Sequence, residues 1–436
     1  MQDFYIGAAT AAHQVEGNNI HSDYWVQENL EHSMFVEPSG RAVDHYNRYQ
    51  EDIDLMKEAG LDAYRFSIEW ARIEPEEGVF DEQEIAHYLN VIKYCLASGL
   101  EPVVTLMHFT SPAWLITKGG WENPEVVEYF GRYTEKIVSV IGPYVKVICT
   151  INEANMRLQL QSLMKSMMAR MSASQDQSKA QPAGGSDTAK NIQVGLNMKA
   201  DMQSAMMESA RAFGVSDPRK IATFVSACTP EGDILVMKAH QKAKEVIKNL
   251  FPEIQVGLTL SLHDMQVVDG AGAAAAEKAA AEWNDEFVHY LPYIGEDDFL
   301  GVQCYTRKCF DASGEVAAPD AGRLTQMGYE GYAPAIGNVV RTVAKDFHGD
   351  LYVTENGLAT DDDEWRCEFV KEAVGSVLKA KADGIPVKGY FYWSLLDNFE
   401  WQRGFSMTFG LISVDRDGNM ARYPKESLRA LGNLNL

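Results

Sequence analysis

Two short acidic motifs carry the residues of this chain that are best suited to chemistry. Ile151-Asn152-Glu153 and Thr354-Glu355-Asn356-Gly357 each follow a short β-branched run, so each glutamate stands where an apolar strand would end. An ionised carboxylate is costly to remove from water, which makes this position a poor choice for stability alone. Two such carboxylates, each beside an asparagine, indicate a pair built for acid–base or nucleophilic chemistry.

The elements that must position these carboxylates alternate between short β-rich runs and longer amphipathic stretches. Strands are predicted at residues 4–10, 63–68, 102–108, 145–151, 255–261, 300–305, 351–355 and 388–393. Helices are predicted at residues 46–59, 81–98, 125–141, 234–250 and 363–382, with a short surface helix at 271–281. Eight alternations predict an α/β fold, a single (β/α)8 TIM barrel that spans residues 1–436 as one domain. A doubly wound sheet is the second choice, because no Gly-rich phosphate turn follows the first strand.

One region, residues 156–218, breaks this rhythm and is predicted to be an atypical Met-rich insertion. It shows no clear strand pattern, and residues 172–190 are rich in Ser, Gln and Gly, which is typical of a mobile loop. Half of the 18 methionines of the chain fall here: Met156, Met164, Met167, Met168, Met171, Met198, Met202, Met206 and Met207. Two interpretations stay open, namely helices whose methionines fill gaps in the packing, or an adaptable apolar wall beside the active site.

The charge composition argues against some classes of binding partner. The 436 residues include 62 Asp and Glu against 39 Lys and Arg, and this net charge of −23 argues against nucleic acid and anionic membranes as partners. The chain starts without a signal-peptide pattern, and no apolar run approaches the ~18 residues of a membrane span, so we expect a soluble cytoplasmic protein. The six cysteines show no metal-ligand spacing and are expected to be buried free thiols. Whether the protein forms a homo-oligomer is left open.

An eight-fold barrel carries its active site at the C-terminal ends of its strands. The residues predicted there are Gln14, Glu16, Arg65, His108, Asn152, Glu153, Tyr305, Glu355, Asn356, Trp393, Glu400 and Trp401. The chain has no HExxH motif, no histidine cluster and no serine elbow, so neither a metal nor a cofactor is expected. Paired carboxylates then suggest glycoside hydrolysis, and tryptophans among hydrogen-bonding side chains suit a sugar. Taken singly, His108 or Trp393 is better explained as a core residue and Arg65 as a structural ion pair, so their joint placement carries the hypothesis.

At these residues the chain resembles glycoside hydrolase family 1, the β-glucosidase family of (β/α)8 barrels with a retaining mechanism. The matching motifs are residues 7–17 (GAATAAHQVEG), 64–70 (YRFSIEW), 119–121 (GGW), 150–153 (TINE), 352–357 (YVTENG) and 392–401 (YWSLLDNFEW). They are spread over nearly the whole chain, and as a set they are highly specific for this family.

The resemblance implies a role for each matching residue. Glu355 would be the nucleophile that forms a covalent glycosyl-enzyme and Glu153 the acid/base, with their carboxyl groups about 5–5.5 Å apart. Arg65 and Tyr305 would keep Glu355 ionised, whereas Glu153 needs a raised pKa. The implied substrate-binding residues are Gln14, His108, Asn152 and Glu400 for the sugar hydroxyls, Trp393 as the floor under the sugar, Trp401 beside Glu400, and Gln303, whose contact is left open.

Four departures from the family pattern leave the substrate open. Ala154 replaces the usual Pro after Asn-Glu, Gln303 replaces the commoner Asn, and Phe109 replaces the Trp that usually follows the histidine. The segment 156–218 lacks the usual Gly/Pro-rich loop. Because the charge of Glu400 would repel a phosphate, non-phosphorylated small β-glycosides or oligosaccharides are the expected substrates, while Arg403 keeps 6-phosphorylated sugars open.

The sequence therefore predicts a retaining β-glycosidase that hydrolyses terminal β-D-glucosides, with galactosides or fucosides as further candidates. One alternative is a transglycosylase that passes the sugar to apolar acceptors held by the Met-rich segment. Another is a sugar-binding barrel with impaired catalysis, which the departures at Gln303, Cys304 and Phe109 suggest. A metal-dependent barrel hydrolase is a third.

Overall fold

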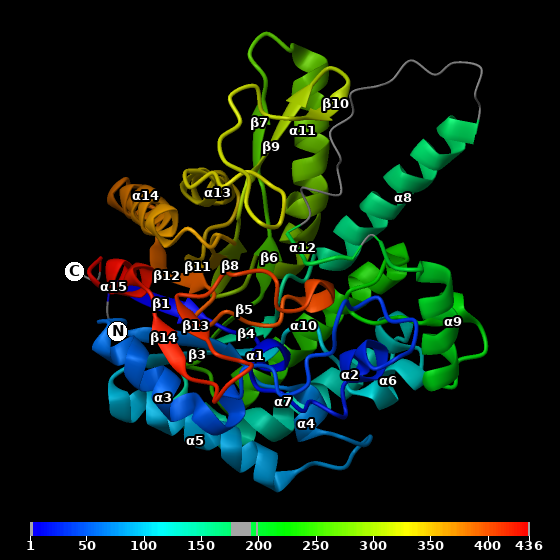
Figure 1. The fold of residues 1–436 in the computed structure, drawn as a ribbon, viewed down its shortest axis with the longest axis vertical. Coiled ribbons are helices and arrows are strands. Elements are labelled where there is room, and N and C mark those ends of the chain that lie inside the picture. Colours follow the sequence, from blue (N-terminus) through cyan, green and yellow to red (C-terminus); the bar gives the residue numbers. More distant parts are fainter. Residues whose placement is uncertain (1–2, 176–192, 198, 435–436) are drawn as a thin grey trace.

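A computed structural model describes residues 3–175, 193–197 and 199–434, with side chains described up to residue 165 in the first range (Figure 1). Its parallel strands confirm the predicted (β/α)8 barrel. The strands of the barrel wall are β1 (Tyr5–Ala9), β2 (Ala63–Ser67), β3 (Glu101–Met107), β4 (Val147–Ile151), β5 (Gln255–Gly257), β6 (Thr259–Ser261), β8 (Phe299–Gln303), β11 (Asp350–Asn356) and β12 (Val387–Trp393).

Closure of the barrel is visible at two seams. β5 and β6 are the two halves of the fifth wall strand, separated only by Leu258, and they pair with β4 and β8 respectively. At the other seam β1 lies between β2 and β12, so the first strand of the wall pairs with the last. Every residue of β1, β2, β4 and β8 is buried, as expected for strands covered on both faces.

Helices surround the wall (Figure 1). The long ones are α3 (His45–Glu58), α5 (Glu82–Ser98), α7 (Val126–Ile141), α10 (Pro230–Leu250), α11 (Ala273–Glu286), α13 (Ala335–Val343) and α14 (Asp363–Ala382). The shorter ones are α1 (Ala12–Val15), α2 (Asp23–Glu28), α4 (Trp70–Ile73), α6 (Ala113–Thr117), α12 (Leu291–Ile294) and α15 (Glu426–Gly432). Helix α7 buries the predicted stripe, including Tyr129, Tyr133 and Ile137, against the core. Asp81 begins α5 by accepting hydrogen bonds from two backbone N–H groups.

A second, three-stranded sheet stands above the strand exits and was not predicted. It consists of β7 (Asp264–Val267), β9 (Arg307–Asp311) and β10 (Gly314–Val316), and with α11 it rises beyond the barrel (Figure 1). These strands lack an apolar alternation because Arg307 and Lys308 are buried there as ion pairs with acidic side chains. A two-stranded sheet, β13 (Ile412–Val414) and β14 (Arg422–Pro424), completes the described strands.

Two helices form much of the described part of the Met-rich region, whereas residues 193–197 and 213–217 lie outside them. Helix α8 covers Met156–Gln175 and α9 covers Met202–Ala212. The prediction of a loop at residues 172–190 is wrong at its start, because residues 172–175 continue α8. Residues 176–190 of that prediction lie outside the described residues, as does Met198.

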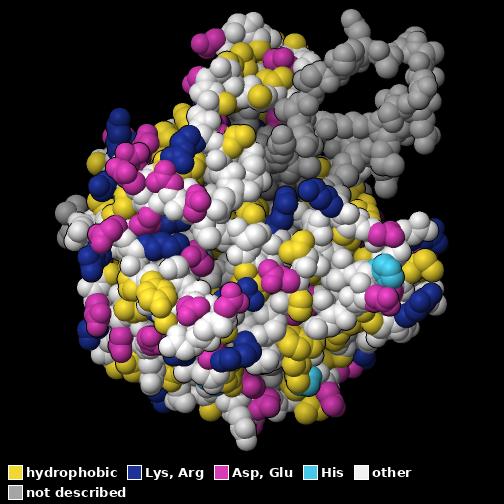
Figure 2. Space-filling model, viewed as in Figure 1, with side chains coloured by type: hydrophobic (Ala, Val, Ile, Leu, Met, Phe, Trp, Pro, Cys, Tyr) yellow, Lys and Arg dark blue, Asp and Glu magenta, His cyan; other side chains and the backbone are white. Residues whose placement is uncertain are grey.

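The surface mixes both signs of charge despite the large net charge. On the face seen in Figure 2, acidic side chains lie among Lys and Arg rather than in one continuous field. No helix within the described ranges is long and apolar enough to span a bilayer. All six cysteines are free thiols; five are buried, as predicted, and Cys367 is half-buried, which differs from the prediction.

Candidate active site

The two motif glutamates lie in the barrel interior at its C-terminal end. Glu355 is near the end of β11, and Glu153 follows β4 by two residues. Both are buried. The second motif requires glycine at position 357, because a Cβ there would lie 1.8 Å from the carbonyl oxygen of Trp393. Glu153 itself has φ +43°, a left-handed conformation that is rare for a residue with a side chain and that often occurs at functional sites.

Glu355 is held from both sides by hydrogen-bond donors. Arg65, fully buried on β2, donates from Nη1 to Glu355 Oε1 at 2.6 Å. The hydroxyl of Tyr305 donates to Oε2, also at 2.6 Å. Charge-assisted bonds of this length favour the ionised carboxylate. The geometry therefore fixes both oxygens of Glu355 and supplies a positive charge to it.

Asn152 is the centre of a second buried network. Its Oδ1 accepts from Arg65 Nη2 at 2.6 Å, from Gln303 Nε2 at 2.8 Å and from the hydroxyl of Thr259 at 3.2 Å. Three donors on one oxygen fix the amide orientation, so Nδ2 faces His108 Nε2 at 3.1 Å. The sequence left the contact of Gln303 open, and in the structure its amide nitrogen orients Asn152.

The surroundings push the pKa values of the two glutamates apart. The pKa of Glu153 is raised well above its ordinary value because the carboxyl group is buried and faces the charge of Glu355. Burial also raises the pKa of Glu355, but Arg65 and Tyr305 oppose that shift. The pair can therefore hold one proton on Glu153 while Glu355 carries the charge. Burial and the nearby Arg65 lower the pKa of His108 far enough to keep its imidazole neutral.

A third group of predicted residues lies at or after the ends of the first, third and last strands of the wall. Gln14, in α1, donates from Nε2 to the backbone oxygen of Phe399 at 2.7 Å and to Glu400 Oε2 at 3.3 Å. The His108 ring lies 5.6 Å from Trp393 and 5.9 Å from Trp401, centroid to centroid. Trp401, like Glu153, is in the left-handed region, with φ +48°.

Two buried polar atoms of this group have no protein partner within the described part of the chain. They are Gln14 Oε1 and His108 Nδ1. Buried polar atoms are normally hydrogen-bonded, and an exception calls for an explanation. A polar ligand that enters the site would supply the missing partners.

Two residues of the predicted set have other tasks. Glu16 accepts hydrogen bonds from Arg72 Nε and from the hydroxyl of Tyr88, both at 2.9 Å, and so belongs to a buried structural cluster. Asn356 donates to the carbonyl oxygen of Cys304 at 2.6 Å and accepts from the hydroxyl of Tyr390 at 2.6 Å. Asn356 therefore fixes the loop that carries Tyr305.

Thr259 and Gln193 are contacts that the sequence did not predict. The Thr259 hydroxyl, at the start of β6, accepts the backbone N–H of Glu153 at 2.8 Å as well as bonding Asn152. The predicted set took no residue from the fifth strand, although the apolar alternation around Leu258 could have placed Thr259 inward. Gln193 bonds the backbone of Tyr305 at 2.7 Å, and no pattern in its polar segment marks it.

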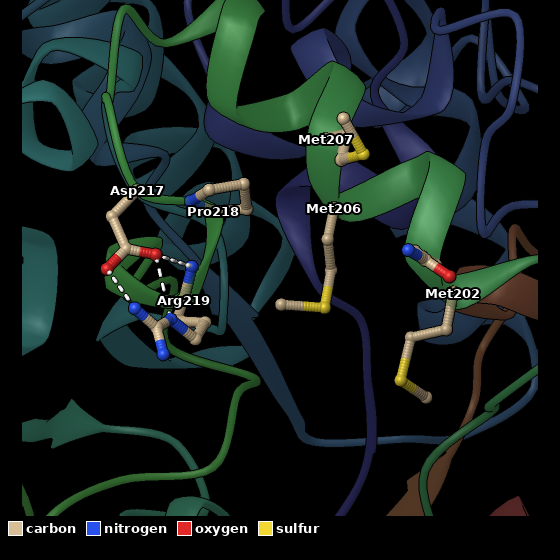
Figure 3. Close-up of a pocket in the computed structure, with 7 residues that line it drawn as sticks. Met202, Met206, Met207, Asp217, Pro218 and Arg219 are labelled. Carbon is tan, nitrogen blue, oxygen red and sulfur yellow. Dashed lines mark hydrogen bonds and ion pairs between the residues drawn. The ribbon is translucent and has the colours of Figure 1, made fainter.

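Of the two roles that were left open, Met156 shows the packing role, whereas the exposed methionines of α9 line a pocket that includes no residue of the site. Met156 is fully buried in the core, whereas Met202, Met206 and Met207 are exposed on α9. Those three line an open pocket of about 460 Å³ together with Gln203, Asp217, Pro218 and Arg219 (Figure 3). The lining includes neither glutamate of the pair and none of the predicted sugar-binding residues. Met167, Met168, Met171 and Met198 lie outside the described side chains.

One surface group has metal-ligand spacing among the described residues. Ligand atoms of Glu31, His32 and Glu208 lie within 4.8 Å of one another. His32 Nδ1 already bonds Glu208 Oε1 at 2.6 Å, and both Glu31 and His32 are exposed. None of the three belongs to the site described above.

Glu400 provides a test of the electrostatics of the site. Burial and the charge of Glu355 raise the pKa of Glu400 to about 8. A carboxyl group with a raised pKa stabilises the fold only while it is protonated, so that contribution is lost as the pH rises toward 8. We expect Glu400→Gln, which cannot ionise, to increase the free energy of unfolding by ~2–4 kcal/mol above pH 8 and to change it little near pH 4.

Thermal unfolding of both proteins between pH 4 and 9 measures this difference. Glu286→Gln is the control of opposite sign, because Glu286 is also buried but His263 and Lys308 lower its pKa to about 2, so its replacement is expected to reduce the free energy of unfolding near neutral pH. A difference in Tm between Glu400→Gln and the parent that does not change with pH would refute the raised pKa.

The chain was compared with known proteins. The model of the family described as glycosyl hydrolase family 1 matches residues 1–178 and 295–435. A β-glucosidase of Agrobacterium sp. is 29% identical, over 95% of this chain and 90% of its own length. Two solved structures are similar throughout: β-glycosidase BGL167, with 40% identity and a TM-score of 0.86, and β-glucosidase 1317, with 35% identity and a TM-score of 0.84. Each covers 99% of this chain, which covers 96% and 98% of theirs.

Proposed function

The chain belongs to glycosyl hydrolase family 1 and is a β-glucosidase-like glycoside hydrolase, and from this premise we propose that it releases terminal β-D-glucosyl groups with retention of configuration. One observation carries the proposal. Of two buried glutamates, Glu355 has both oxygens bound by Arg65 and Tyr305, whereas the pKa of Glu153 is raised well above its ordinary value.

In the first step Glu355 acts as the nucleophile. Its carboxylate attacks the anomeric carbon while the bond from that carbon to the leaving oxygen breaks. Glu153 gives its proton to the leaving oxygen, so the aglycone departs as a neutral alcohol. The sugar is left as a glycosyl ester of Glu355, and Glu153 is left as a carboxylate.

In the second step the roles reverse. Glu153 takes a proton from water, and the water oxygen attacks the anomeric carbon from the face that the aglycone left. The ester bond to Glu355 breaks and its carboxylate is restored. Two inversions at one carbon return the β configuration.

The residues around the pair support sugar binding. Asn152, whose orientation is fixed by Arg65, Gln303 and Thr259, is proposed to bind the 2-hydroxyl of the sugar, where hydrogen bonds strengthen in the transition state. Gln14, His108 and Glu400 are proposed to bind the other hydroxyls. The unpartnered Gln14 Oε1 and His108 Nδ1 support this assignment. Trp393 is proposed as the floor under the ring, and Trp401 as the wall beside Glu400.

The sugar is proposed to be non-phosphorylated. The charge of Glu355 acts at this position strongly enough to help raise the pKa of the buried Glu400 to about 8, and the same charge would repel a phosphate dianion placed beside Glu400. Arg65 and Tyr305 bind Glu355, and Thr259 binds the backbone of Glu153, so the groups needed for catalysis are held in place, which favours hydrolysis over an impaired sugar-binding barrel. The lining of the methionine pocket gives no specific support to transfer onto apolar alcohols.

A panel of p-nitrophenyl β-glycosides tests the proposal. We expect turnover of the β-glucoside to exceed that of the β-galactoside and β-fucoside, with none of the α-glucoside and little of the β-glucoside 6-phosphate. Proton NMR during the first minutes is expected to show β-glucose before mutarotation. An α-anomer formed first would refute retention, and the absence of turnover on every β-glycoside would refute the function.

A further inference from the structure

Tyr305 is held to Glu355 through a peptide unit whose two polar groups are both bound by side chains. The carbonyl oxygen of Cys304 accepts from Asn356 Nδ2 at 2.6 Å. The N–H of Tyr305, in the same peptide unit, donates to Gln193 Oε1 at 2.7 Å. Asn356 is a residue of the acidic motif itself, but Gln193 comes from a distant part of the chain. Asn356 therefore holds the carbonyl group of this peptide unit and Gln193 holds its N–H group, and together they fix its orientation.

The Gln193 amide has only one orientation that satisfies its neighbours. Its Nε2 donates to the carbonyl oxygen of Leu262 at 3.1 Å and lies 2.9 Å from His263 Nε2. Because a carbonyl oxygen only accepts and a backbone N–H only donates, Oε1 must face Tyr305. Gln193 is buried, and it bridges the chain that leaves β6 to the chain that leaves β8.

The far side of this bridge is itself rigid. His263 Nδ1 lies 2.8 Å from Glu286 Oε1, and the His263 backbone N–H donates to Oε2 of the same carboxylate at 2.9 Å. Lys308 also pairs with Glu286 at 2.9 Å. His263 and Lys308 lower the pKa of Glu286 to about 2 against the effect of burial, so it stays ionised and accepts the imidazole proton. With Nδ1 donating to Glu286, His263 Nε2 can act as an acceptor toward Gln193 Nε2, which lies 2.9 Å away.

We propose that Gln193 is a positioning residue for the nucleophile, because it fixes the Tyr305 backbone and thereby holds the Tyr305 hydroxyl on Glu355. This inference rests on the proposed function. Gln193 lies between the two stretches that the family model matches, so the device belongs to the part of this chain that differs from the family pattern. It touches no reacting atom and acts only through Tyr305.

A double-mutant cycle tests the proposal. Gln193→Leu removes all three polar contacts of the side chain at similar size, and we expect kcat on p-nitrophenyl β-glucoside to fall ~10- to 100-fold with little change in KM. The acidic limb of kcat/KM is expected to move to higher pH, because Glu355 loses a donor to its ionised form. In a Tyr305→Phe background the same substitution is expected to change kcat less than twofold, because the hydroxyl that it positions is already gone.

The controls separate positioning from general damage to the segment. Asn197 lies in the same segment and bonds the Met34 carbonyl oxygen and the Gln402 side chain, so Asn197→Ala is expected to leave the acidic limb in place. If Gln193→Leu does not fold, Gln193→Asn serves instead, since it keeps the amide but is too short to bridge both strand exits. The inference would be overturned if the kcat losses of Gln193→Leu and Tyr305→Phe multiplied in the double mutant. It would also be overturned if Asn197→Ala shifted the acidic limb of kcat/KM as far as Gln193→Leu does. Failure of the proposed function is distinct, because the parent protein would then turn over no β-glycoside at all.

Discussion

Glu355→Ala is expected to lower kcat on p-nitrophenyl β-glucoside by on the order of 10⁵-fold, because no other group is placed to form the covalent intermediate. The lost carboxylate leaves a space that Arg65 and Tyr305 face with unused donors. Added azide is expected to enter this space and to attack the anomeric carbon from the nucleophile's side. The product would then be the α-glucosyl azide, identified by NMR, and part of the rate would return.

The matched control for Glu355→Ala is Glu16→Gln. Glu16 is a buried glutamate near the same end of the barrel but pairs with Arg72 and Tyr88, so its replacement is expected to reduce stability and to keep kcat within a few-fold. Glu355→Ala activity within tenfold of the parent would remove Glu355 from the nucleophile's role. A β-glucosyl azide as the rescued product would assign Glu355 to the opposite face and so to the acid/base role.

Glu153→Ala is expected to show a loss that depends on the leaving group. With p-nitrophenyl or alkyl β-glucosides, kcat/KM should fall ~10²- to 10⁴-fold, because the departing oxygen no longer receives a proton. With 2,4-dinitrophenyl β-glucoside, whose leaving group is a good anion, kcat/KM should change little. The glycosyl ester of Glu355 should then accumulate, since water has lost its base, and mass spectrometry of the quenched protein should detect it.

Azide separates Glu153 from Glu355 by the product that it gives. It needs no base, so it should speed turnover of the dinitrophenyl glucoside by Glu153→Ala and should yield the β-glucosyl azide. Equal losses on all leaving groups would exclude Glu153 as the acid. The parent should show a bell-shaped pH profile of kcat/KM, with the acidic limb set by protonation of Glu355 and the alkaline limb by ionisation of Glu153.

The barrel strands were predictable because each is an apolar run bounded by a helix pattern of different period. The three-stranded sheet of β7, β9 and β10 was not, because its buried Arg307 and Lys308 read as surface residues until their acidic partners are known. Helix α13 was missed as well, although it buries an apolar stripe that includes Ile336, Val339 and Val340.

The sequence predicted those site residues that belong to a recognisable motif. It did not predict site residues that stand alone in the sequence. Arg65, Asn152 and Glu355 all stand in specific motifs, Arg65 within β2 and the other two at strand ends, and hydrogen bonds connect them in the structure. Thr259 and Gln193 are isolated polar residues whose tasks depend on contacts with chain far away in sequence. Glu16 shows the converse, because it lies within a motif and yet serves a structural cluster.

β1 is the first strand of the barrel wall to be synthesised and β12 the last. Because they pair, β1 cannot complete its hydrogen bonds until β12 is present. Both carboxylates precede β12 in the chain, whereas Glu400 and Trp401 follow it. A nascent chain that ends before Val387 therefore carries the reactive groups without a closed ring to hold them. We expect catalytic competence to appear only once β12 is present, and chains truncated before Val387 to lose all activity rather than a share of it.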